Sequence, residues 1–285
     1  MIRNILKDFF KFIKCPDDNQ LNLNIREKIK FVSILLFFEV VFTLLVIFPL
    51  FEVIGKIEII KVDKIDYSET LIFSFFIMVI LVPLFEELCF RYILRYQGFK
   101  IKFITRQTWN KIFPFLVYFL SSIFGFIHLS NYKNEGYLFL LISPLIVLSQ
   151  LIGGLIITFI RIRINFTWGV CYHLIWNFIV VIAVPSIEYQ LTKPYIEINE
   201  KYKISITEKP FFNENDTRIL KIDSVNHEIK KIEIKQYSLQ NLIDTLYTKD
   251  KYYVDDVLID LNYSSKEYST KEDFLKILIK KYDIK

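Results

Sequence analysis

The 285-residue sequence has little of what stabilises small secreted domains or binds structural metals: three cysteines, three histidines and seven glycines. Cys15, Cys89 and Cys171 have no CxxC spacing, which argues against a disulfide framework or a zinc knuckle and favours small core residues. The GxSxG and HExxH motifs are absent and no cysteine has a convincing base, so hydrolase designs built on those motifs have little support.

Apolar residues dominate what is present. The composition is 53% hydrophobic with 28 phenylalanines, and the mean hydropathy is +0.35, which indicates membrane-spanning segments. Residues 1–185 hold 19 basic and 13 acidic side chains, whereas residues 186–285 hold 17 and 18. The net charge of +5 therefore belongs to the apolar part. It predicts membrane topology and contact with anionic lipid, and no nucleic-acid partner is expected.

Five apolar segments are each long enough to cross about 30 Å of hydrocarbon. They are residues 31–50, 71–97, 112–130, 136–160 and 164–187, and the second is expected to continue as helix to Gln97. In the fourth, Ser149, Gly153 and Gly154 form a small-residue face that predicts close helix packing. The N-terminal residues 2–14 place apolar and basic side chains on opposite helical faces, which is typical of a helix on a membrane surface and not of a signal peptide.

The distribution of Lys and Arg sets the expected orientation. Residues 1–30 hold seven basic residues, and the loop after the second segment holds six without an acid. The loop after the first segment contains more acids than bases, and the loop after the third has only Lys133 as a base. The positive-inside rule then predicts a multi-pass protein of the cell membrane with a cytoplasmic N-terminus and an extracytoplasmic C-terminal domain.

From about Glu188 the pattern is that of an extramembrane domain with balanced charge. Residues 195–208, 218–225, 230–237 and 254–263 alternate as strands do. Residues 237–247 and 269–282 are typical of helices, opened by Ser238 and by Ser269 or Thr270. The only histidine of this part, His227, stands alone and is not expected to be functional.

The expected fold class is therefore an all-α polytopic membrane protein with a small C-terminal α+β extramembrane domain. It would have about five transmembrane helices and an N-terminal amphipathic helix. The expected parts are residues 1–30 (amphipathic helix and linker), 31–187 (transmembrane domain) and 188–285 (extramembrane domain).

Three charges interrupt the second apolar segment: Glu86, Glu87 and Arg91. Each costs roughly 2.5–3.5 kcal/mol near the bilayer centre, whereas each Leu, Ile, Phe or Val returns only about 0.3–0.6 kcal/mol. A lipid-facing helix is therefore disfavoured, and a buried functional cluster is expected. Glu87 and Arg91 share a helical face and can pair, while Glu86 has no partner on its own helix. We expect Glu87 to be structural, Glu86 to be free for chemistry, and Pro83 to kink the helix.

Two of the three histidines lie in apolar segments, His128 one turn after Phe124 and His173 one turn before Asn177. A single such histidine is more often an interhelical hydrogen-bonding group, but this combination predicts a polar, water-containing cavity. Glu86 can take a proton from water. The imidazoles can bind Zn²⁺ beside a carboxylate or, without metal, hydrogen-bond a developing oxyanion, to which Asn177 also offers a donor. The set is suited to hydrolysing a peptide bond with an activated water.

The segments EELCFR (Glu86, Glu87, Arg91), FGFIH (Phe124, His128) and HLIWN (His173, Asn177) resemble the EExxxR, FxxxH and HxxxN/D motifs of the CPBP family. This family comprises the CAAX-protease and bacteriocin-processing intramembrane proteases, also called the Abi or type II CAAX prenyl endopeptidase family. The three motifs occur in family order within roughly residues 70–185.

The resemblance implies a helical membrane core enclosing a cavity, with Glu86 as general base and Asn177 assisting. It implies that His128 and His173 are metal ligands or oxyanion donors, so the site is either a zinc site of Glu86, His128 and His173 or metal-free. Tyr92 departs from the glycine that often follows the motif arginine. The eukaryotic CAAX proteases resemble eight-span proteins, whereas five spans are expected here, and the C-terminal domain has no identified counterpart.

Three functions are compatible with these features. The favoured one is an intramembrane endopeptidase that cleaves a peptide or protein within or at the lipid bilayer, of CAAX-protease or bacteriocin-processing type. The second is a non-proteolytic binding or bacteriocin-immunity protein on the same scaffold, suggested by the C-terminal domain, whose partner is unknown. The third is an ion transporter with a Glu/His relay, which the lack of an internal repeat disfavours.

Overall fold

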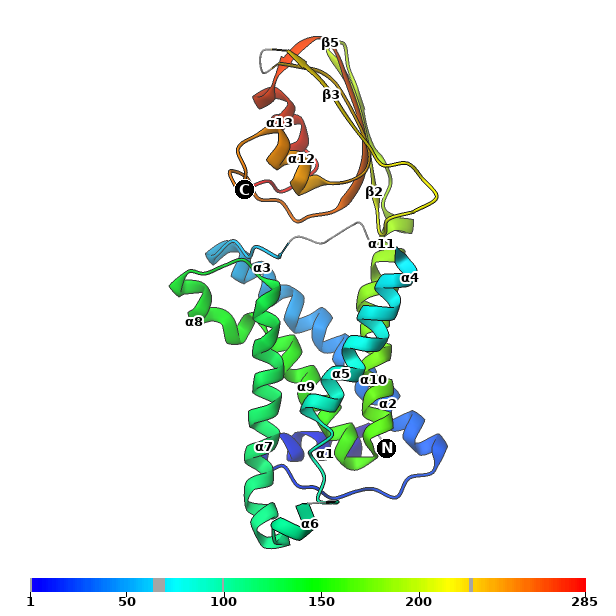
Figure 1. Ribbon diagram of the computed structural model, residues 1–285, viewed down its shortest axis with the longest axis vertical. Coiled ribbons are helices and arrows are strands. Elements are labelled where there is room, and N and C mark those ends of the chain that lie inside the picture. The colour runs from blue at the N-terminus through cyan, green and yellow to red at the C-terminus, as the bar shows by residue number, and fades with distance from the viewer. Residues whose placement is uncertain (1, 64–69, 99, 226–227) are drawn as a thin grey trace. The chain divides into compact units, whose positions relative to one another are not determined.

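The computed structural model describes residues 2–63, 70–98, 100–225 and 228–285 (Figure 1). Two sequence-based interpretations, the isolated His227 and the loop charge Lys64, fall outside these residues. The chain divides into two compact units: Met1–Ile60 with Ile77–Ile179, and Lys61–Phe76 with Val180–Lys285. The helical elements and a small C-terminal antiparallel sheet confirm the predicted fold class.

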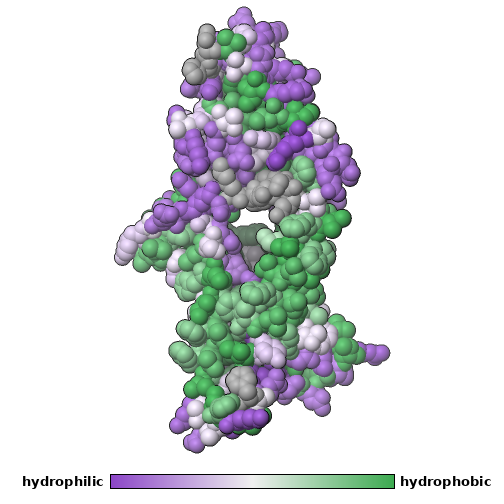
Figure 2. Space-filling model, viewed as in Figure 1, coloured by the Kyte–Doolittle hydropathy of each residue, from purple (hydrophilic) through white to green (hydrophobic). Residues whose placement is uncertain are grey.

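Five helical spans among the described residues are long and apolar enough to cross a membrane. They are Ile25–Ile57 (α2, η1, α3), Leu71–Phe90 (α4, η2, α5), Arg106–Asn131 (α7, η3), Tyr137–Arg163 (α8, α9) and Phe166–Leu191 (α10, η4, α11). Each overlaps one of the five predicted segments. Figure 2 shows that hydrophobic residues cover much of the visible surface of the helical part, whereas hydrophilic residues predominate on the sheet domain. The protein is thus built as a multi-pass membrane protein.

Each of these five described spans contains a proline, and three of these prolines follow a π-helical segment. A π-helical segment lies just ahead of Pro49, Pro83 and Pro185: η1 (Thr43–Ile47), η2 (Phe75–Leu81) and η4 (Ile179–Ala183). Proline has no N–H to donate and its ring clashes with the carbonyl four residues earlier. A wider π turn changes the hydrogen-bond pairing in front of the proline and lets the helix continue. The irregularity expected at Pro83 therefore takes the form of a π segment.

The second span ends earlier than predicted. Helix α5 (Val82–Phe90) stops at the C-cap residue Arg91, so the expectation of helix to Gln97 is wrong. The side chain of Arg161, on α9 (Leu148–Arg163), donates to the carbonyl oxygens of Arg91 (3.3 Å) and Tyr92 (3.4 Å). The Arg91 carbonyl oxygen also accepts from the Leu94 N–H at 3.1 Å. Both carbonyls are thus paired without a further helical turn, and unpaired carbonyls are costly in a membrane. The arginine therefore allows the helix to end inside the protein.

The core of the helical unit surrounds α9, which packs against α2 (Ile25–Phe42), α7 (Arg106–Ile127), α8 (Tyr137–Ile146) and α10 (Phe166–Phe178). Close approach is possible because the chain has glycines there, as predicted. A Cβ on Gly153 would lie 2.6 Å from Glu39 Oε1, and one on Gly154 would lie 2.9 Å from Phe124 Cδ1. Real Cβ atoms do not approach other atoms so closely, so a larger residue at either position would force the facing side chain to move.

Helix α1 (Ile2–Lys14) forms as predicted, but its buried stripe is Ile5, Phe9 and Phe12, while Ile2 and Phe10 remain exposed. The rings of Phe9 and Phe12 each lie 5.3 Å from that of Phe159 on α9. Through these contacts, the predicted surface helix belongs to the core of the helical unit.

The second unit contains a five-stranded antiparallel sheet in the order β1-β2-β5-β4-β3. The strands are β1 (Tyr195–Ile198), β2 (Tyr202–Lys209), β3 (Ile219–Val225), β4 (Glu228–Ser238) and β5 (Leu258–Thr270). Helices α12 (Leu239–Leu246) and α13 (Lys271–Ile279) cover one face of the sheet (Figure 1) and share its core. Their N-caps are Ser238 and Thr270, which confirms the predicted helix starts.

Part of the linker between the first two spans belongs to this second unit. The Tyr253 hydroxyl accepts a hydrogen bond from the Val62 N–H at 3.0 Å, and Thr70 forms a parallel bridge with Phe212. The linker follows the first span and the sheet domain follows the fifth, so four crossings separate them. The linker and the sheet domain therefore lie on the same side of the membrane.

Candidate active site

The charged residues of α5 meet a histidine of α10 inside the helical unit. Glu87 is fully buried; its Oε1 lies 3.2 Å from Arg91 Nη1 and 2.9 Å from His173 Nδ1. The predicted Glu87–Arg91 pairing is thus confirmed. A carboxylate can only accept hydrogen bonds, so Nδ1 of His173 carries the proton of that bond. Glu87 therefore sets the tautomer of His173 and compensates the charge of Arg91.

Glu86 lies on the other side of the same imidazole. Its Oε2 is 3.5 Å from His173 Nε2, and its side chain is 17% exposed. In a neutral ring whose Nδ1–H faces Glu87, Nε2 carries a lone pair. A lone pair and a carboxylate facing each other repel unless one of them holds a proton. Glu86 and His173 Nε2 therefore form a pair able to share one proton.

Arg91 is held by more than its carboxylate partner. The guanidinium carbon lies 3.7 Å from the ring centroid of Phe124, and Nη2 would be 3.1 Å from a Cβ on Gly154. Within the described structure, Nη1, Nη2 and Glu87 Oε2 are buried and make no aligned hydrogen bond. This leaves unused hydrogen-bonding capacity beside the Glu86–His173 pair.

The ring of Phe124 connects the two histidines. Its centroid is 5.0 Å from that of His128 and 5.8 Å from that of His173, both edge to face. His128 caps α7 at its C-terminus, and its Nδ1 lies 2.7 Å from the Phe124 carbonyl oxygen, to which it donates. The Nε2 of His128 takes no part in that bond.

Asn177 lies one turn beyond His173 on α10. Its amide donates to the carbonyl oxygen of Met78 at 2.9 Å, in the π segment η2 ahead of Glu86 and Glu87. The side chain therefore ties the fifth span to the second, and one of its amide hydrogens is engaged in that contact.

The structure thus brings Glu86, Glu87, Arg91 and His173 into direct contact, with Phe124 between this group and His128. The predicted zinc set of Glu86, His128 and His173 is not assembled. Among the described residues, no group of three or more His, Cys, Asp or Glu side chains is arranged to hold a metal ion. His173 also presents one ring nitrogen to each of two glutamates, an arrangement suited to proton transfer.

Sequence reasoning missed two residues near this cluster. Glu39 is 2% exposed in α2 and accepts a hydrogen bond from Tyr172, the neighbour of His173. Arg161 supports the end of α5, as described above. The available signal was that each is a charge in or at the end of an apolar span. Only the folded structure shows which helix each of these two side chains faces.

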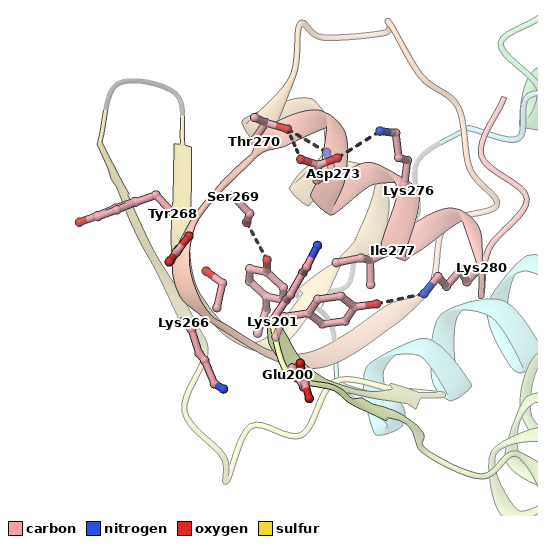
Figure 3. A pocket seen from close by; sticks show the side chains of 14 residues that line it. Glu200, Lys201, Lys266, Tyr268, Ser269, Thr270, Asp273, Lys276, Ile277 and Lys280 are labelled. Atoms are coloured by element: carbon pink, nitrogen blue, oxygen red, sulfur yellow. Dashed lines mark hydrogen bonds and ion pairs between the residues drawn. The ribbon is translucent and has the colours of Figure 1, made fainter.

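A separate cavity of about 650 Å³ lies in the second unit between β5, the β1–β2 turn and α13 (Figure 3). Charges on its wall are paired, as with Asp273, which accepts from Thr270 (2.8 Å) and Lys276 (3.1 Å). Lys280 binds Glu197 at 2.7 Å and, with tyrosine hydroxyls, lowers the pKa of Glu197 to about 2. The lining contains no histidine or cysteine, and it offers no counterpart to the Glu/His cluster.

Comparison with known proteins finds a family model that matches part of the helical region. Residues 68–179 match the family model described as Rce1-like, type II CAAX prenyl endopeptidase Rce1-like. No curated protein and no solved structure matches the chain. The matched range contains Glu86, Glu87, Arg91, Phe124, His128, His173 and Asn177.

Proposed function

We propose that the protein is a CAAX-type intramembrane protease in which Glu86 activates the water that hydrolyses the peptide bond. The match of residues 68–179 to the Rce1-like type II CAAX prenyl endopeptidase model supports the reaction class. The observation that carries this assignment is the position of His173 between two unlike glutamates. Glu87 is paired with Arg91 and with Nδ1, whereas Glu86 pairs with Nε2 and is partly exposed. Glu86 is therefore the carboxylate available to a water molecule.

The proton transfers follow from this arrangement. Glu86 removes a proton from water as the water oxygen attacks the carbonyl carbon of the scissile bond. The proton is shared between Glu86 and His173 Nε2 and is delivered to the leaving amine nitrogen as the C–N bond breaks. Glu87, which lies between Arg91 and Nδ1 of His173, is placed to stabilise the imidazolium form of His173 during the transfer.

The oxyanion that develops on the carbonyl oxygen needs hydrogen-bond donors. We assign this role to His128 through Nε2 in its protonated form, since Nδ1 is occupied by the Phe124 carbonyl. Asn177 assists by holding η2, and with it Glu86, against α10. The donor arrangement does not favour a zinc centre, so no step is routed through a metal, and metal analysis is part of the test.

The substrate is a peptide or protein segment at or within the membrane. We propose a C-terminal CAAX-like sequence as the first candidate because of the family, and a bacteriocin-type precursor as the second. In the proposed orientation the N-terminus is cytoplasmic, and the linker around Val62 and the sheet domain are both extracytoplasmic.

The test is cleavage of fluorogenic peptides, prenylated and unprenylated, by purified protein in detergent. We compare wild type with Glu86→Gln and, as matched control, Glu52→Gln, an exposed glutamate at the end of the first span. Loss of a general base lowers kcat by about 10²–10⁴-fold, whereas the control should be unchanged. Metal content is measured on the same samples. Undiminished cleavage by Glu86→Gln would overturn the assignment, and stoichiometric zinc would overturn its metal-free form.

A further inference from the structure

A second buried carboxylate lies outside the catalytic cluster. Glu39 is 2% exposed, and the described structure provides no cation opposite it; its partner is the hydroxyl of Tyr172, which donates to Oε2. Burying a carboxylate that lacks an opposite charge is costly, especially in a membrane-spanning segment. We therefore expect the Glu39 carboxylate to have a specific role besides filling space in the core.

Three helices are shaped around this carboxylate. On α9, Gly153 leaves room for it, since a Cβ there would lie 2.6 Å from Glu39 Oε1. On α10, Tyr172 is fully buried and directs its hydroxyl at α2. The Glu39–Tyr172 hydrogen bond thus joins the first span to the fifth at the point where α9 passes both.

Tyr172 and His173 are consecutive, so they point about 100° apart around α10. One faces Glu39 on α2 and the other faces Glu86 and Glu87 on α5. Carboxylates on α2 and α5 therefore bind side chains on two sides of α10 and restrict the rotation of this helix about its own axis. With an imidazole about 6 Å from the helix axis, a rotation of about 10° moves the ring by roughly 1 Å, which is enough to weaken proton transfer severely.

We infer that Glu39 is a positioning residue: through Tyr172 it fixes the rotation of α10 and thereby holds His173 between Glu86 and Glu87. The kinetic part of this inference rests on the proposed function. The geometric part, that the Glu39–Tyr172 contact sets the environment of His173, does not depend on it.

The experiment compares wild type with two variants. Tyr172→Phe removes the hydroxyl that donates to Glu39 but changes the side-chain volume little. Glu39→Gln keeps an oxygen that can accept the hydrogen bond from Tyr172. Tyr172→Phe should lower kcat about 10–100-fold with little change in KM, because the catalytic geometry is lost while substrate contacts remain. Glu39→Gln should retain most of the rate. Thermal unfolding in detergent identifies variants that simply misfold, and rates are expressed per folded molecule.

A second readout does not need activity. The chain has three histidines, so ¹⁵N-imidazole NMR can resolve each ring, with His173→Gln to assign the signal. In wild type and Glu39→Gln, the His173 signals should report a single Nδ1–H tautomer bonded to a carboxylate. In Tyr172→Phe they should shift or broaden. A folded Tyr172→Phe with wild-type kcat and unchanged His173 signals would overturn the inference. Wild-type protein that cleaves nothing would count against the proposed function, while the NMR comparison would still decide the positioning role.

Discussion

Glu86 and Glu87 are neighbours in sequence, yet their replacement by glutamine should have opposite consequences. Glu87 is fully buried between Arg91 and His173, and Arg91 is itself 1% exposed. Removing the charge at Glu87 leaves a buried guanidinium without its direct ion-pair partner. Glu86 is 17% exposed, and Arg91 keeps its direct pair with Glu87 when Glu86 is replaced. Glu87→Gln should therefore impair stability, and Glu86→Gln should impair chemistry.

The expected losses of stability depend on how deeply each glutamate is buried. Breaking one partner of a buried ion pair costs about 3–5 kcal/mol. The Phe124 ring, 3.7 Å from the guanidinium, still stabilises the cation, so we expect the lower end, about 3 kcal/mol. A partly exposed contact such as Glu86–His173 contributes about 0–1 kcal/mol. The rate loss for Glu86→Gln, about 10²–10⁴-fold, should accompany almost unchanged stability.

The assay is reversible unfolding in mixed detergent micelles, followed by cleavage measured per folded molecule. The double variant Glu87→Gln with Arg91→Gln completes the cycle and should recover part of the lost stability, because no unpaired charge remains. The reasoning would be refuted by a Glu87→Gln protein as stable as wild type, or by a Glu86→Gln protein destabilised by several kcal/mol with normal activity per folded molecule.

Three further outcomes follow from the contacts. Gly154→Ala should lose about 1–3 kcal/mol of stability and much of its activity, since the new Cβ crowds Phe124 and Arg91; unchanged unfolding would contradict this. Ser238→Ala removes the N-cap of α12 and should cost about 0.5–2 kcal/mol, seen as faster amide exchange in that helix only. The hydrogen bond from Lys280 lowers the pKa of Glu197 to about 2 from 4.5, so its stabilisation is present above about pH 4.5 and lost toward pH 2. Glu197→Gln should flatten that acid dependence in amide-exchange measurements of the sheet domain, and an unaltered dependence would exclude the effect.

Local patterns in the chain were sufficient for much of the architecture. Apolar runs longer than the bilayer is thick have one stable solution, a spanning helix, because backbone groups cannot remain unpaired in lipid. Alternating strands and the N-caps Ser238 and Thr270 likewise act over a few residues. The Glu87–Arg91 pair was predictable because helical periodicity sets it without reference to any other element.

Predictions failed where one helix determines another. The second span was expected to reach Gln97 but ends at Phe90, and Arg161 from α9 donates to the carbonyl oxygens of the two residues that follow the helix. The sequence predicts that α1 has an apolar face, but it does not indicate that Phe9 and Phe12 are buried against Phe159 while Phe10 stays exposed. Both outcomes depend on partners more than sixty residues away, which periodicity does not contain.

The same distinction between local patterns and contacts between helices applies to the candidate site. The sequence by itself determined which ionisable groups enter the membrane, since each is too costly there to be incidental, and which of them share a helix face. Only the tertiary structure decided that His173 meets both glutamates, that Phe124 separates it from His128, and that Glu39 reaches Tyr172. The physical reason is that contacts between helices depend on their rotation and depth. These are set by where glycines such as Gly153 and Gly154 allow close approach.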